Sequence, residues 1–97
     1  MEEICRFFES MQIPEYAVRH NIARFERHPD IAAEFTDWLH TKQYRTENAV
    51  SVRGYTAEAI FEKAPFLNGA GAFNFLITLR ESPEKAEAIL AEGFKRK

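Results

Sequence analysis

The chain has 97 residues, of which 45% are hydrophobic and 29% charged, and its formal net charge is -2. This composition is typical of a globular protein and excludes a disordered chain, and the length suits a single domain over residues 1–97 with one modest core. The near-neutral charge excludes a general attraction to nucleic acid or anionic lipid, so such binding would need a local basic patch.

The first 41 residues are predicted to form three helices. Apolar residues recur at helical spacing over about residues 2–11, which gives the first helix one buried face. Pro14 suits the first turn of a second helix that ends near residue 27, and Pro29 restarts the chain as a third helix up to about residue 41. The connection between these two helices is short, so we expect an antiparallel hairpin. The apolar faces are formed by Ile4, Phe7, Phe8, Met11, Val18, Ile22, Phe25, Ile31, Phe35, Trp38 and Leu39.

An irregular segment separates these helices from the rest of the chain. Helical periodicity is lost over residues 42–54, where Val50 and Val52 are expected to pin an extended loop to the core. A fourth helix then begins at Thr56, whose hydroxyl can cap the first turn, and it ends before Pro65.

The fifth helix begins after Asn68 and is apolar on nearly every side, which is typical of a central, buried helix. Residues 82–84 combine a capping serine, a first-turn proline and a first-turn acid, and they open a sixth helix. Gly93 is placed to end that helix, with Phe94 folding back on it. The sequence therefore predicts an all-α, compact single-domain bundle of about five to six short helices. The large side chains of the fifth helix cannot share one face; they are Phe73, Phe75, Leu76, Ile77 and Leu79.

The segment from Gly54 to Arg80 consists of two of these helices around a tight turn, and it resembles a helix-turn-helix. The resemblance implies a small DNA-binding regulator in which Asn74 and Thr78 contact bases, or a helical pair that serves packing alone. Two features depart from the motif: Phe61 stands where a small residue is usual, and residues 65–66 lengthen the turn. The matching residues are Thr56, Ile60, Gly69, Gly71, Ala72, Leu76 and Leu79.

Charged residues form stripes on the second and third helices, and both stripes are predicted to face solvent. The stripe on the third helix is acidic and is formed by Asp30, Glu34 and Asp37. Two interpretations stay open: solvated faces with some pairing between neighbouring helices, or a basic surface for nucleic acid or an acidic protein. The candidate basic surface consists of Arg19, His20, Arg24, Arg27, Asn74, Thr78 and Arg80, with the tail residues Lys95, Arg96 and Lys97 beside it.

Aromatic residues are abundant, with nine phenylalanines in a chain this short. Large rings need cover from neighbours or from a partner, so rings that the core leaves uncovered would form a docking patch. The alternative is that these rings close the ends of the bundle. The candidate protein interface, for a partner or for self-association, consists of Phe7, Phe8, Tyr16, Trp38 and Tyr44.

No motif predicts a catalytic, cofactor or metal site. The histidines are scattered at His20, His28 and His40, and no nucleophile signature is present. The single Cys5 cannot form an intramolecular disulfide and fits a reducing cytoplasm, and no leader or membrane-spanning stretch is seen. We therefore expect a cytoplasmic, non-enzymatic domain without cofactor, membrane contact or small-molecule substrate. It is expected to act as a protein-protein interaction or adaptor module, the alternative being the DNA-binding regulator.

Overall fold

The computed structural model of the protein describes residues 1–92, apart from the side chains of residues 68 and 69. Within these residues the chain forms six α-helices and no strand, so the all-α prediction is confirmed. The predictions for Gly93, Phe94 and the basic tail lie outside the described residues. The helices are α1 (Glu2–Ser10), α2 (Glu15–Glu26), α3 (Pro29–Thr41), α4 (Ala57–Lys63), α5 (Asn68–Glu81) and α6 (Pro83–Ala91), with a short 3-10 helix, η1 (Pro65–Leu67), between α4 and α5.

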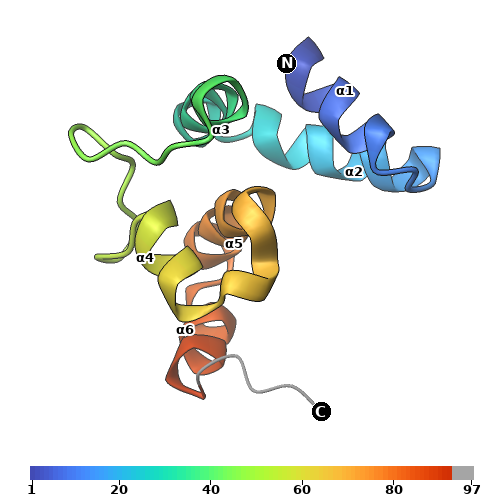
Figure 1. Ribbon diagram of the computed structural model, residues 1–97. Coiled ribbons are helices and arrows are strands. Elements are labelled where there is room, and N and C mark those ends of the chain that lie inside the picture. The colour runs from blue at the N-terminus through green and yellow to red at the C-terminus, as the bar shows by residue number, and fades with distance from the viewer. Residues whose placement is uncertain (93–97) are drawn as a thin grey trace.

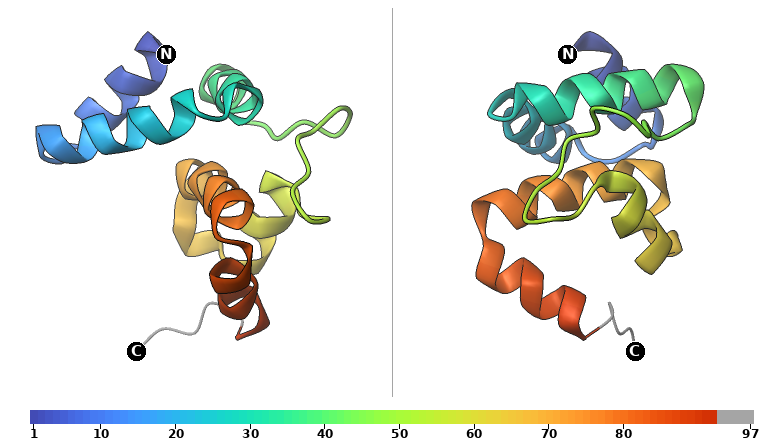
Figure 2. Two further views of the ribbon diagram at one scale, coloured as in Figure 1. Left: turned by 180° about the vertical axis from the view of Figure 1, so that it is seen from behind. Right: turned by 90° about the vertical axis from the view of Figure 1, so that its left-hand side faces the viewer.

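The helices form two layers, with α1, α2 and α3 in one and α4, α5 and α6 in the other (Figure 1). α2 and α3 cross steeply, since each is seen along its length where the other is seen nearly end-on (Figure 2). The predicted antiparallel hairpin is therefore wrong. Of the two residues between these helices, Arg27 keeps a helical backbone (φ -75°, ψ -14°), so the chain changes direction at His28 alone (φ -133°, ψ 73°). A single non-helical residue bends the chain between the two helices but does not reverse its direction.

α5 is the centre of the molecule, as its apolar sequence predicts. It packs against α2 and α3 in one layer and α4 and α6 in the other. All five of its large side chains are buried, so the helix has no apolar face left for solvent.

An aromatic cluster joins the two layers. The fully buried Phe35 of α3 stacks on Phe25 of α2 at 5.1 Å and on Phe73 of α5 at 5.2 Å between ring centroids. Phe7 and Phe8 of α1 approach the same ring at 5.8 and 6.1 Å. Offset and tilted pairs of this kind are favourable beyond the area they bury.

The segment between α3 and α4 is irregular, as predicted, and Val52 pins it to the core. Val52 and Tyr55 exchange two backbone hydrogen bonds, at 2.8 and 2.9 Å, across a two-residue turn. Arg53 and Gly54 form that turn with positive φ angles of 52° and 88°, a conformation that suits glycine.

Glu34 anchors the same segment to α3. Its side chain was expected to face solvent, and that expectation is wrong, because only 2% of Glu34 is exposed. The carboxylate accepts a hydrogen bond from the Val50 backbone N–H at 2.7 Å. Burial raises the pKa of Glu34, and that hydrogen bond offsets part of the rise. A buried acid here satisfies a loop N–H that no helix or strand supplies with a partner.

The helix starts were predicted with mixed success. Thr56 caps α4, since its hydroxyl accepts a hydrogen bond from the Ala59 N–H at 3.2 Å. Ser82 precedes α6 but makes no side-chain cap bond, because its backbone (φ -137°, ψ 66°) lacks the extended conformation of Thr56 (φ -102°, ψ 169°). Pro14 lies one position earlier than predicted, as the residue before the first turn of α2.

Candidate interaction groove and adjoining polar network

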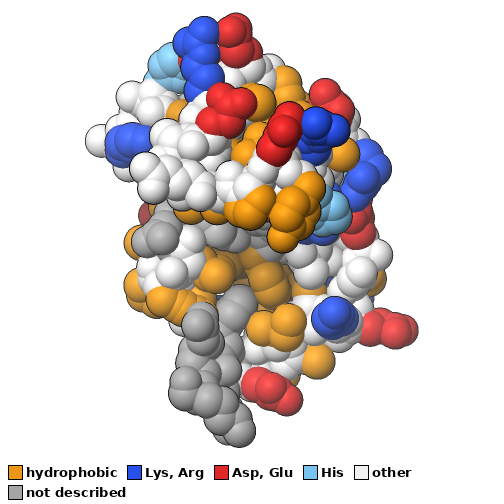
Figure 3. Space-filling model, turned by 90° about the vertical axis from the view of Figure 1, so that its right-hand side faces the viewer, with side chains coloured by type: hydrophobic (Ala, Val, Ile, Leu, Met, Phe, Trp, Pro, Cys, Tyr) orange, Lys and Arg blue, Asp and Glu red, His pale blue; other side chains and the backbone are white. Residues whose placement is uncertain are grey.

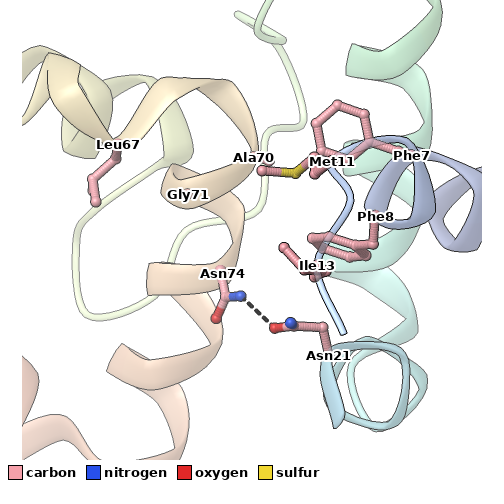
Figure 4. A pocket seen from close by; sticks show the side chains of 9 residues that line it. All are labelled: Phe7, Phe8, Met11, Ile13, Asn21, Leu67, Ala70, Gly71 and Asn74. Carbon is pink, nitrogen blue, oxygen red and sulfur yellow. Dashed lines mark hydrogen bonds between the residues drawn. The ribbon is translucent and has the colours of Figure 1, made fainter. Parts of the chain in front are cut away.

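A hollow of about 240 Å³ lies between the α1–α2 connection and the beginning of α5. Figure 3 looks onto this side of the molecule, where hydrophobic side chains lie in a recess between the two layers. We call this hollow the apolar groove. It is lined by Phe7, Phe8, Met11, Ile13, Asn21, Leu67, Ala70, Gly71 and Asn74 (Figure 4).

The α5 wall of the groove contains two small residues, Ala70 and Gly71. A Cβ atom at Gly71 would lie 2.8 Å from the Cβ of Leu67, closer than real contacts of this kind. Gly71 therefore packs closely on Leu67, and any larger residue there would require the chain at Leu67 to shift. On the opposite wall, Gln12 adopts a left-handed backbone (φ 61°) that turns the chain between Met11 and Ile13, both of which line the groove.

The rim of the groove leaves apolar surface in contact with solvent. Met11 is 50% exposed, and Phe7 and Ile13 are half-buried. Phe66, which precedes the groove residue Leu67, is also exposed over a large part of its surface. The lining carries no charged side chain, so the groove suits an apolar group.

Two amides form the polar end of the groove. Asn74 Nδ2 donates a hydrogen bond to Asn21 Oδ1 at 2.8 Å, and Asn21 Nδ2 donates to the Ala17 carbonyl at 2.9 Å (Figure 4). Each amide nitrogen carries two hydrogens, so each retains a second donor after these bonds.

Arg24 lies between α2 and α5, and the prediction that it faces solvent is wrong. Its side chain is 17% exposed. Arg24 Nη2 donates to Asn74 Oδ1 at 3.0 Å and to the Thr78 hydroxyl at 2.8 Å. α2 therefore packs against α5 through this part of its basic stripe, and the two side chains expected to contact bases are bonded to an arginine of the same chain.

At the end of α5, Glu81 contacts side chains of α2 and of the α2–α3 corner. Its carboxylate accepts hydrogen bonds from Arg27 Nε at 2.9 Å and from His28 Nε2 at 2.7 Å. These bonds, from Arg27 first and His28 second, lower the pKa of Glu81 to about 2. Arg24 Nη1 lies 3.8 Å from the same carboxylate. Glu81 thus lies against two cations of the predicted basic surface, Arg24 and Arg27.

Arg80 is also paired within the chain. It donates to both carboxylate oxygens of Asp30 at 3.0 and 2.9 Å, and its Nη1 lies 3.3 Å from His28 Nδ1. The hydrogen bond from Arg80 is the main cause of the lowered pKa of Asp30. We call this set the polar network; it consists of Asn21, Arg24, Arg27, His28, Asp30, Asn74, Thr78, Arg80 and Glu81.

The structure thus brings together only part of the predicted basic surface. Arg24, Arg27, Asn74, Thr78 and Arg80 converge in the polar network. The other two residues of that surface do not join it. Arg19 pairs with Glu15 at 2.8 Å on the outside of α2, and His20 is exposed on the same helix.

The predicted protein interface is likewise divided. Phe7 and Phe8 line the apolar groove, whereas Tyr16 is 77% exposed elsewhere on α2. Trp38 and Tyr44 are half-buried and pack against the core, with their ring centroids 6.1 Å apart. These five rings therefore do not form one patch.

Sequence reasoning did not bring the groove residues together as one site. Phe7 and Phe8 were predicted to belong to a protein interface, Met11 to the apolar face of the first helix, and Gly71 and Asn74 to the helix-turn-helix-like segment. Ile13, Asn21, Leu67 and Ala70 received no role. The missing signal is spatial, since Ile13 and Leu67 lie more than fifty positions apart in the sequence and neither shares a motif with the other.

Comparisons with known proteins add no functional information. No protein-family model matches the sequence, and searches of curated proteins and of solved structures give no significant match. None of the helices described here has the length and apolar composition needed to cross a bilayer. Among residues 1–92, no three histidine, cysteine or acidic side chains are grouped so as to hold a metal ion.

Proposed function

We propose that this protein is a small helical interaction module whose apolar groove receives an apolar side chain of a protein partner. The observation that carries the proposal is the concave, uncharged lining with the half-exposed Met11 at its rim. Contiguous apolar surface in contact with water is unfavourable, and where it persists it usually marks an interaction site.

The size of the groove limits what can enter it. A dry apolar cavity of about 150 Å³ holds one benzene ring, so about 240 Å³ suits one large aromatic or branched side chain. The amides of Asn21 and Asn74 at the polar end can donate to a carbonyl oxygen beside that side chain. This combination favours a peptide segment of a partner, with one anchoring side chain and an adjacent backbone carbonyl.

A capture experiment with matched variants tests the proposal. Met11→Asp places a charge at the rim of the groove, and Tyr16→Asp places the same charge on an exposed site outside it. Tagged parent and variants are incubated with native cell extract, with and without nuclease, and captured proteins are quantified. We expect Met11→Asp to reduce capture of a specific protein by about tenfold or more, while Tyr16→Asp leaves it unchanged.

The remaining outcomes separate the alternatives. Equal capture by the parent and Met11→Asp would remove the groove from the function. Loss of capture on nuclease treatment would favour the DNA-binding regulator. Sedimentation equilibrium of the purified chain shows whether the partner is a second copy, in which case Met11→Asp should weaken the association.

A further inference from the structure

His28 occupies a junction between the two layers of the molecule. It is the residue before the first turn of α3 and the only departure from helical backbone at the α2–α3 corner. Its side chain is 12% exposed and faces the end of α5. One ring nitrogen contacts Glu81 and the other contacts Arg80, so the imidazole bridges two adjacent residues of α5 that carry opposite charges.

These partners favour one tautomer of the ring. A guanidinium group has hydrogen-bond donors and no acceptor, so in a hydrogen bond between Arg80 Nη1 and His28 Nδ1, which lie 3.3 Å apart, Nδ1 is the acceptor. A neutral imidazole has one donor and one acceptor, so Nε2 carries the hydrogen and donates to Glu81 at 2.7 Å. These two contacts fit a neutral His28 with its hydrogen on Nε2.

We propose that His28 is a pH-responsive contact between α5 and the α2–α3 corner, which exchanges its hydrogen-bond partners when the ring gains a proton. A protonated imidazole donates from both nitrogens, so Nδ1 can no longer accept from Arg80. The Arg80 guanidinium then faces a second cation and keeps its two hydrogen bonds to Asp30. The bond from Nε2 to Glu81 becomes charge-assisted and strengthens.

The charged groups around His28 come from three helices and from the corner between α2 and α3. Arg24 of α2 and Arg27 of the corner lie against the Glu81 carboxylate that His28 contacts, Asp30 of α3 pairs with Arg80, and Arg80 and Glu81 belong to α5. Protonation strengthens the contact with Glu81 and removes the contact with Arg80, so the two effects oppose one another in total stability. The change is therefore local, a rearrangement of the corner against α5, and it must be measured at the side chains themselves.

Nuclear magnetic resonance of the free protein tests the inference, and it does not depend on the proposed function. The ring nitrogen shifts of His28 and the guanidinium nitrogen shifts of Arg80 are followed from pH 8 to pH 5, the interval in which histidines commonly change charge. We expect the Nε2–H tautomer at pH 8, and an Arg80 signal that moves with the same midpoint as the His28 ring.

Two variants locate the effect. In His28→Gln the Arg80 signal should stay constant over that interval. His40→Gln is the matched control, because His40 is also paired with a glutamate, Glu3, but on the exposed surface between α3 and α1. It should leave the Arg80 titration unchanged. A Nδ1–H tautomer at pH 8, or an Arg80 signal in the parent that does not follow His28, would overturn the inference, whatever the folding of the variants.

Discussion

α5 makes two contacts with the α1–α3 layer, and their chemistry differs. Toward α3 it presents Phe73, which stacks on the buried Phe35. Toward α2 it presents Asn74 and Thr78, which accept hydrogen bonds from Arg24. We call the surface of α5 that contacts Phe35 the apolar side and the surface that contacts Arg24 the polar side.

The difference between the two sides shows how a helix can be buried all round and still carry polar residues. The apolar side holds the layers together by area and close packing, which are not directional. The polar side requires donors and acceptors to meet, so it favours one position of α2 along α5. Polar residues that look like a recognition surface in the sequence here serve the packing of one helix on another.

Breaking the apolar side should have the largest effect. Phe73→Ala removes a fully buried ring that stacks on Phe35, and we expect it to lower the free energy of unfolding by about 3–5 kcal/mol. Urea denaturation measures the change. Tyr16→Ala, which removes an exposed ring, is the control and should change stability by no more than about 0.5 kcal/mol. Equal stability of Phe73→Ala and the parent would contradict the central position of α5.

Breaking the polar side should have a smaller effect. Arg24→Met keeps an unbranched apolar stem and removes the guanidinium, which leaves Asn74 Oδ1 and the Thr78 hydroxyl without their donor. We expect a loss of about 1–3 kcal/mol in urea denaturation. Arg19→Met, which breaks the exposed pair with Glu15, is the control and should cost at most about 1 kcal/mol. A more stable Arg24→Met would show that the polar side contributes specificity and not stability.

Acid should weaken the contacts of Glu81, which lies at the end of α5 next to the polar side. The pKa of Glu81 is lowered to about 2 in the folded protein, against about 4.3 for a glutamate in an unfolded chain. Since the unfolded state binds the proton more tightly, the stabilisation from Glu81 is fully present above about pH 4.3 and is lost as the pH falls toward 2. Glu81→Gln should be less stable than the parent at pH 6, and the difference should shrink in denaturation curves at lower pH. A difference that stays constant would contradict this role.

The helices were predictable because their signals are local. The proline starts of α3 and α6, the Thr56 cap and the all-round apolar sequence of α5 each depend on neighbours within a few positions. The steep crossing of α2 and α3 depends on the backbone of one residue, His28, and no pattern in the sequence predicts that conformation.

The burial of charged residues could not be predicted from the same signals. Glu34 and Arg24 occupy positions in charge stripes that are indistinguishable in sequence from solvated faces. Glu34 is buried because a loop N–H from residue 50 reaches it, and Arg24 because α5 packs over it. The apolar groove was missed for the same reason, since its walls come from residues near 10 and near 70. The burial of Glu34, the burial of Arg24 and the apolar groove all depend on contacts between segments that are distant in the sequence.

The smallest effect is expected at Tyr44, which places a polar group on the apolar side. Its ring centroid lies 5.7 Å from those of Phe61 and Phe73, and its hydroxyl is buried with no hydrogen-bond partner among the described residues. Burial, with a contribution from Glu58, raises the pKa of Tyr44 to about 12. Burying a hydroxyl without a hydrogen-bond partner costs hydration energy, and the phenylalanine variant avoids that cost. Tyr44→Phe should therefore be as stable as the parent or more stable by up to about 1 kcal/mol. Tyr16→Phe, at an exposed ring, is the matched control and should not change stability. Urea denaturation of both variants decides: a clear loss of stability in Tyr44→Phe alone would show that this hydroxyl is bonded in solution and that the apolar side also depends on a polar contact.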